Sequence, residues 1–164
     1  MRAVVQTILE SPEFVDPRHR FARYSWPIEY VVRAIKEVGW TGYSVNDAMT
    51  PLANMGLQLF EPPDVNGWEL GRGWFSTAGA LARMNFAAAL ASNQRFSLRD
   101  QARDANASPQ ALLSWTLDRL GAAPFDGRPY NELLTYAGAG FPRWRGSDQE
   151  VLVKAAGLVH LVLG

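Results

Sequence analysis

Apolar residues recur at three- and four-residue intervals through most of this 164-residue chain, and this spacing limits its fold more than any other feature. It aligns apolar side chains along one face of a helix, whereas a half-buried strand alternates apolar and polar residues. The chain shows no sustained alternation of the strand type and no internal repeat of the length used by repeat proteins. The pattern therefore predicts an all-α fold, formed as a single globular domain over residues 1–164.

About seven helices are predicted, and their starts are better marked than their ends. Proline near a first turn marks two of the starts, and a serine or threonine N-cap marks several others. Ser147 and Glu150 have the spacing of a capping box, and Ser44 with Asp47 resembles one in which aspartate replaces the usual glutamate. The predicted helices cover residues 2–9, 27–38, 44–56, 77–91, 108–120, 129–137 and 148–163.

Two segments between or beside these helices are harder to assign. The first helix has an apolar stripe, and the loop over residues 13–24 that follows it is expected to lie over the core. The second segment, residues 92–107, is polar and suggests a solvated helical face or a linker. The side chains behind these expectations are Val4, Val5, Ile8 and Leu9 in the stripe, Phe14, Val15 and Phe21 in the loop, and Arg95, Arg99, Asp100, Arg103 and Asp104 in the polar segment.

Composition argues against several classes of function. Sixteen basic residues balance sixteen acidic ones, so no global positive field favours nucleic acid as a partner. The chain has no cysteine, which excludes disulfides, thiolate metal sites and a cysteine nucleophile. The most hydrophobic stretch, residues 151–163, includes Lys154 and His160 and is too short for a transmembrane segment.

The most unusual segment is residues 58–75, a long loop rich in proline, glycine and tryptophan. Long ordered loops in compact domains are either functional or held in place by their own side chains. In a structural interpretation, four apolar residues anchor the loop to the helices, while Asp64 and Asn66 form hydrogen bonds with turn backbone. The four expected anchors are Phe60, Val65, Trp68 and Trp74.

Two functional interpretations of the same loop remain open. In one, Glu61, Asp64 and Asn66 line a small polar or metal-binding pocket, although the glycine position and the missing distal glutamate differ from a calcium loop. In the other, Trp68 and Trp74 form an exposed platform for a sugar or a peptide. The candidate ligand-binding residues are therefore Glu61, Asp64, Asn66, Trp68 and Trp74, with the identity of any metal or small ligand left open.

No catalytic residue and no cofactor is predicted. The chain lacks a Gly-x-Ser-x-Gly elbow, a phosphate-binding loop and a dinucleotide fingerprint. Its two histidines, His19 and His160, lie far apart in the sequence and have no ligand residue at helical spacing. An enzymatic activity therefore has no positive support in the sequence.

Several motifs together resemble a bacterial family known only as domain-of-unknown-function family 1800. They are Ile8-Leu9-Glu10-Ser11-Pro12-Glu13-Phe14, Trp26-Pro27-Ile28-Glu29-Tyr30, Pro62-Pro63-Asp64-Val65-Asn66-Gly67-Trp68, Leu81-Ala82-Arg83-Met84-Asn85-Phe86 and the closing residues 156–163. The chain departs from the family pattern at Phe75-Ser76, where an apolar residue followed by asparagine is expected. The resemblance implies the C-terminal part of a longer protein that is exported or periplasmic. It implies no activity, catalytic residue or cofactor.

The last predicted helix remains apolar up to Gly164, which suggests a chain cut from a larger protein. The leading hypothesis is a non-catalytic helical structural or interaction module that packs against the N-terminal remainder of an envelope-associated parent. The alternative is a ligand-, metal- or sugar-binding site, enzymatic or not, built on the loop over residues 58–75.

Overall fold

Every regular element that the computed structural model describes is a helix or a 3₁₀ turn. The description covers residues 1–19, 22–93, 97–122, 125–141 and 143–164, and no strand occurs within these ranges. The α-helices are α1 (Arg2–Leu9), α2 (Pro27–Glu37), α3 (Val45–Asn54), α4 (Thr77–Ala91), α5 (Leu98–Gln101), α6 (Pro109–Arg119), α7 (Gly127–Gly138) and α8 (Asp148–Leu163). Short 3₁₀ turns cover Pro17–His19, Gly71–Trp74 and Arg103–Ala105. The all-α prediction is confirmed.

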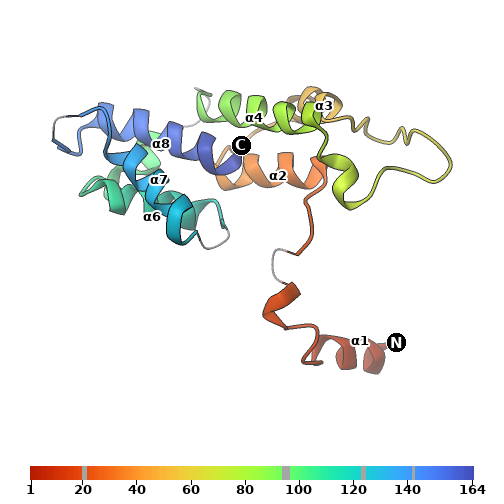
Figure 1. Cartoon of the computed structure of the whole chain (residues 1–164). Coiled ribbons are helices and arrows are strands. Elements are labelled where there is room, and N and C mark those ends of the chain that lie inside the picture. Colours follow the sequence, from red (N-terminus) through yellow and green to blue (C-terminus); the bar gives the residue numbers. More distant parts are fainter. Residues whose placement is uncertain (20–21, 94–96, 123–124, 142) are drawn as a thin grey trace.

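The core is formed by α2, α3, α4, α6, α7 and α8. Helix α8 contacts α4, α5, α6 and α7, and Figure 1 shows it running beside α4. Complete burial of an aliphatic side chain contributes about 1.5–3 kcal/mol, so the residues removed from solvent here account for much of the fold's stability. The largest include Val31 and Ile35 of α2, Leu52 of α3, Leu90 of α4, Leu112 and Leu113 of α6, and Leu158 of α8.

The predicted capping boxes are present at the starts of α3 and α8. The Glu150 carboxylate accepts the main-chain N–H of Ser147 at 2.8 Å, and the Ser147 hydroxyl accepts the N–H of Glu150 at 3.3 Å. At α3, the Asp47 carboxylate accepts the N–H of Ser44 at 2.8 Å. These reciprocal bonds satisfy main-chain donors that no helical carbonyl can reach, which fixes where each helix begins.

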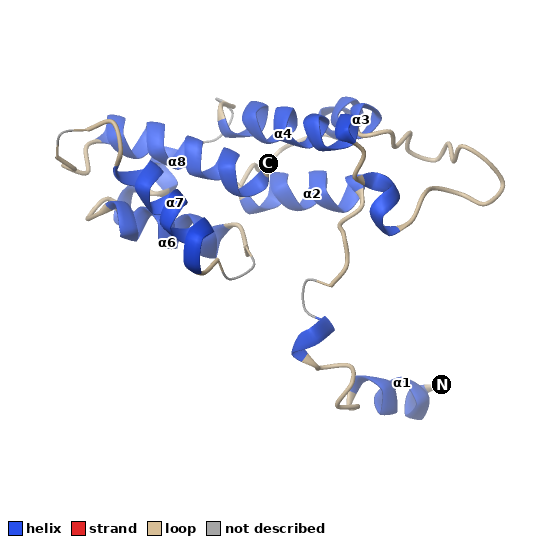
Figure 2. Ribbon diagram, in the orientation of Figure 1, coloured by secondary structure: helices blue, strands red, loops and turns tan. Residues whose placement is uncertain are grey.

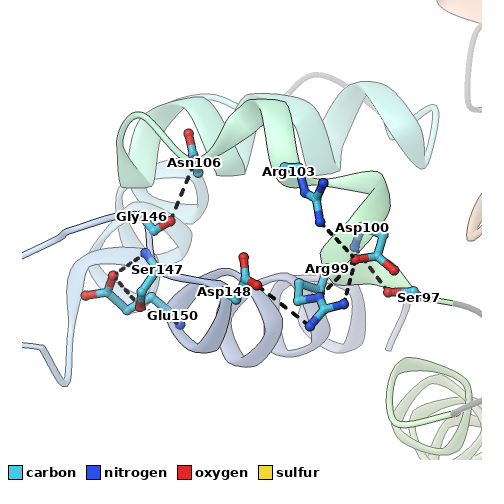
Figure 3. A network of polar contacts seen from close by, with 9 residues as sticks. All are labelled: Ser97, Arg99, Asp100, Arg103, Asn106, Gly146, Ser147, Asp148 and Glu150. Atoms are coloured by element: carbon cyan, nitrogen blue, oxygen red, sulfur yellow. Dashed lines mark hydrogen bonds and ion pairs between the residues drawn. The ribbon is translucent and has the colours of Figure 1, made fainter.

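The polar segment over residues 97–106 packs against the start of α8, as Figure 3 shows. Arg99 pairs with Asp100 at 2.8 Å and approaches Asp148 at 3.8 Å, while the Asn106 side chain donates to the carbonyl of Gly146 at 3.4 Å. Such exposed ion pairs contribute little to stability. Burial of Leu98, Ala102 and Ala105 holds the segment in place, so it contains the short helix α5 rather than a free linker. Arg95 lies outside the described residues.

Helix α1 stands apart from the other helices (Figure 1) and has no buried residue. Phe14 and Val15, which follow it, are 56% and 70% exposed, so the expectation that their loop covers the core is wrong for these two residues. Phe21 falls outside the part of the chain that is described. An apolar stripe shows that a helix has a face to bury, but it does not identify what buries that face.

Helix α4 buries a different face from the one its larger apolar residues suggest. Leu81 and Met84 are 56% and 48% exposed, whereas the buried residues are Gly79, Arg83, Ala87, Leu90 and Ala91. Helix α4 contacts α8 and α3. Among the described residues, no helix has both the length and the hydropathy needed to cross a membrane.

Candidate functional site

The polar residues of the predicted loop site lie on its exposed surface. The loop leaves α3 and extends away from the helices before the 3₁₀ turn that precedes α4 (Figure 2). Asp64 accepts the N–H of Asn66 at 2.7 Å through its side chain and that of Gly67 at 3.1 Å through its carbonyl. Gly67 has a φ of 89°, which favours glycine, so these residues form a tight turn. Glu61 instead borders a hollow beside α3.

The two tryptophans of the loop point in the other direction, toward the core. Trp74 is 7% exposed, and its ring centroid lies 6.3 Å from that of Trp26. Trp68 is half-buried and packs against the core cluster. The indole Nε1 of each is buried and lacks a hydrogen-bond partner within the described ranges. The prediction that these two residues anchor the loop is confirmed.

The prediction is wrong for the other two expected anchors. Phe60 is 86% exposed and Val65 is fully exposed, and neither packs against a helix. Phe60 has a φ of 65°, a conformation that few residues other than glycine adopt. Leu70, at 71% exposure, adds a third apolar side chain to the surface of the loop. The loop is therefore fixed near its tryptophans and exposes three apolar side chains.

The structure does not gather the five candidate ligand-binding residues into one cavity. Four cavities among the described residues are each lined by at most one of them. In the same part of the chain, no three His, Asp or Glu residues are grouped closely enough to hold a metal ion. A ligand, metal or sugar site on this loop therefore stays a prediction.

A separate cavity of about 390 Å³ lies between α2, α4 and the ends of α6 and α8. Helix α2 contributes Tyr30, Arg33 and Glu37, which share one face because their spacing is three and four residues. Helix α4 contributes Arg83, and α8 contributes its last turn. Tyr24, Phe75, Phe125, Val162 and Leu163 give the wall its apolar surface.

Arg83 is the most buried charged group of this cavity, with 6% of its surface exposed. Its guanidinium carbon lies 4.7 Å from the ring centroid of Tyr30 and 4.5 Å from that of Phe75. Nη2 donates to the carbonyl of Ser25 at 2.8 Å, whereas Nε is buried and finds no partner among the described residues. Desolvation lowers the pKa of Arg83, but a guanidinium still keeps its proton in proteins.

The two other arginines of the cavity are neutralised by glutamates. Arg23 forms a two-bond pair with Glu29 at 2.7 and 2.9 Å. Arg33 bonds to Glu37 at 2.6 Å and also donates to main-chain carbonyls at the end of α6. Sequence analysis did not single out Arg83. The available signal was an arginine at i+4 spacing between Gly79 and Ala87, on the face of α4 that is made of small residues.

Comparison with protein families gives one finding. The model of a family described as protein of unknown function, DUF1800, matches residues 1–164. No curated protein and no solved structure matches the chain.

Proposed function

The chain belongs to the DUF1800 family, and we propose that it is a non-catalytic helical module that docks through α1 onto the N-terminal remainder of a larger protein. The observation that carries the proposal is the exposed apolar stripe of α1. Its members, Val4, Val5, Ile8 and Leu9, are 61%, 52%, 54% and 50% exposed. The envelope setting of the larger protein is part of the proposal and is supported by the family resemblance alone.

The geometry of α1 supports a docking role. Its eight residues separate into an apolar face and a polar face, and on the polar face Gln6 donates to Glu10 at 2.9 Å. Isolated helices this short are marginal in water, because too few hydrogen bonds offset the cost of starting a helix. A partner that buries the apolar face would supply the missing stabilisation, since each fully buried aliphatic side chain contributes about 1.5–3 kcal/mol.

The exposed apolar side chains of the loop offer a second contact for the same partner. Phe60, Val65 and Leu70 are exposed on a loop that Trp68 and Trp74 fix to the core. Burying these side chains against another protein would remove apolar surface from water, which favours association. The fixed base lowers the entropy lost when such a loop binds, which favours association.

Hydrogen exchange of the α1 amides tests the proposal when it is measured in the 164-residue chain and in the longer protein that contains it. We expect fast exchange in the isolated chain and strong protection in the longer protein. The double variant Val5→Glu, Ile8→Glu should abolish that protection, whereas Gln6→Glu on the polar face should preserve it. Equally fast exchange of α1 in both proteins would refute docking through this helix.

A further inference from the structure

Arg83 carries a buried positive charge for which the described residues supply no side-chain carboxylate. The hydrogen bonds of its guanidinium within these residues consist of the one from Nη2 to Ser25, although a guanidinium has five N–H donors. Burying a charge without an ionic partner is costly, and buried charges in proteins are normally paired. The guanidinium lies over the rings of Tyr30 and Phe75, and these contacts offset only part of this cost.

Arg83 lines an open cavity, so its unpaired charge lies where a small molecule could bind. The volume of about 390 Å³ lies within the range of small-molecule sites. The N–H groups of a guanidinium lie in its plane, so a ligand that accepts hydrogen bonds from Arg83 meets it along its edge. An edge-on approach matches the two oxygens of a carboxylate, which accept parallel hydrogen bonds from a guanidinium.

The remaining wall of the cavity indicates the rest of the ligand. Phe125, Val162 and Leu163 are apolar, so they favour a ligand body without polar groups. Arg23 and Arg33 are already paired with Glu29 and Glu37, which leaves Arg83 as the lining arginine without a side-chain carboxylate among the described residues. One such charge matches a monoanion, whereas a phosphate dianion would leave a negative charge unpaired.

We propose that this cavity binds a small organic carboxylate, with the carboxylate against the edge of Arg83 and an apolar body against Phe125 and the last turn of α8. The assignment goes beyond the docking role of α1, because it involves a different face and neither proposal depends on the other. Tyr30 positions the guanidinium, which lies over its ring, and its one hydroxyl hydrogen is within reach of the carbonyls of Leu163 at 2.9 Å and Arg83 at 3.2 Å.

Isothermal titration of the whole chain with three probes tests the ligand class. Benzoate carries one carboxylate on an apolar ring, benzamide has nearly the same shape without the charge, and inorganic phosphate has the charge without the apolar body. We expect saturable one-to-one binding of benzoate and at least about tenfold weaker binding of the other two, a difference of about 1.4 kcal/mol. Equal binding of benzamide, equal binding of phosphate, or no binding of benzoate would each overturn the assignment.

Variants locate the binding to the cavity. Arg83→Met removes the charge, and Ala122→Phe fills the cavity from the segment after α6 while it leaves Arg83 in place. Arg128→Gln is the matched control, because it removes an exposed arginine of α7 that lies outside the cavity. We expect the first two variants to weaken benzoate binding at least about tenfold and the control to leave it unchanged.

The Ala122→Phe variant keeps the proposal testable even if Arg83→Met does not fold. If Arg83→Met does not fold, Ala122→Phe decides the result, since loss of binding there supports the site. Unchanged benzoate affinity in a folded Ala122→Phe protein would place the binding elsewhere and overturn the proposal. A direct readout is the NMR signal of the Arg83 Nε–H, which should shift on benzoate addition and stay unchanged on benzamide addition.

Discussion

The side chain of Lys154 contacts Tyr136 in two ways, once through its main chain and once through its ring. Nζ donates to the Tyr136 carbonyl at 2.6 Å and lies 4.2 Å from the ring centroid of the same residue. Tyr136 belongs to the last turn of α7, where unpaired carbonyls favour a positive charge. Lys154 is 6% exposed, and burial lowers the pKa of its ammonium. One residue of α7 thus holds a buried cation of α8.

We expect Lys154→Met to change the free energy of unfolding at neutral pH by no more than about 1 kcal/mol. The variant loses the contacts of the ammonium, but it also no longer has to bury a charge. The Tyr136 carbonyl keeps a second donor in the N–H of Ala139 at 3.3 Å. Because the pKa of Lys154 is lowered, the unfolded chain binds more protons just below the ordinary value of 10.5. The stability that this group contributes therefore rises with pH through that window.

Urea unfolding from neutral to alkaline pH measures this effect. The wild-type chain should gain stability relative to Lys154→Met as the pH approaches 10.5. Lys36→Met on exposed α2 surface is the matched control and should follow the wild-type curve. Parallel curves for wild type and Lys154→Met would contradict the assigned direction of the pKa change.

Gly157 of α8 leaves the space that Tyr136 occupies. A methyl group at position 157 would overlap the Tyr136 hydroxyl and lie 2.6 Å from ring Cζ. Alanine is favoured over glycine in a helix interior by about 1 kcal/mol, but forcing extra atoms into a packed contact costs about 1–3 kcal/mol. We expect Gly157→Ala to lower the free energy of unfolding, because the displaced ring also uncovers Lys154.

A double-mutant cycle in urea separates the two effects in Gly157→Ala. In a Tyr136→Ala background the clash is absent, so Gly157→Ala should become neutral or stabilising. Gly138→Ala on α7 is the control, since a methyl group there would meet Pro109 at an ordinary 3.9 Å. If Gly157→Ala were equally costly in both backgrounds, contact with Tyr136 would not be its cause.

The helix starts were predictable from the sequence because the groups that define them are neighbours in the chain. Ser147 and Glu150 are three residues apart, and their reciprocal hydrogen bonds require no partner from elsewhere in the fold. The segment that contains helix α5 was left open between a helical face and a linker, because the four residues of α5 are too few to show a periodic pattern. Its position depends on Leu98, whose burial results from packing against other helices.

The cavity was not predictable either, because its residues are brought together by packing between helices that are distant in the sequence. Arg83, Ser25 and Phe75 come together only when α2 and α4 pack, and an arginine in an alanine-rich helix gives no local sign of burial. In the loop, the turn at Asp64 was predictable because a short-range hydrogen bond forms it. The exposure of Phe60 and Val65 was not, since apolar character indicates a preference for burial without showing where a partner lies.

The Glu150 carboxylate is expected to stabilise the folded chain at neutral pH and to lose this effect in acid. Hydrogen bonds from the main-chain N–H and hydroxyl of Ser147, and from the N–H of Arg145, hold its pKa below the ordinary value of 4.5. Because the folded state binds this proton less readily than the unfolded chain, the contribution is complete above 4.5 and disappears as the pH falls through the lowered value.

We expect Glu150→Gln to reduce stability at neutral pH and to lose less stability than the wild-type chain on acidification. Urea unfolding over a series of acidic buffers measures both quantities. Glu132→Gln, which removes an exposed carboxylate paired with Arg128, is the control and should keep the wild-type pH profile. A Glu150→Gln profile parallel to that of the wild type would show that the cap does not depend on charge.

Removal of α1 should leave the stability of the remaining helices nearly unchanged. The helix has no buried residue, so deleting residues 1–9 removes little apolar contact, and we expect the free energy of unfolding to change by less than about 0.5 kcal/mol. Ile35→Ala in the centre of the core is the reference and should cost about 2–5 kcal/mol. Urea unfolding of the deleted chain, the Ile35→Ala variant and the wild type compares the two changes directly. If the deletion cost as much as Ile35→Ala, α1 would pack on the bundle in solution, and its apolar face would not be available for a partner.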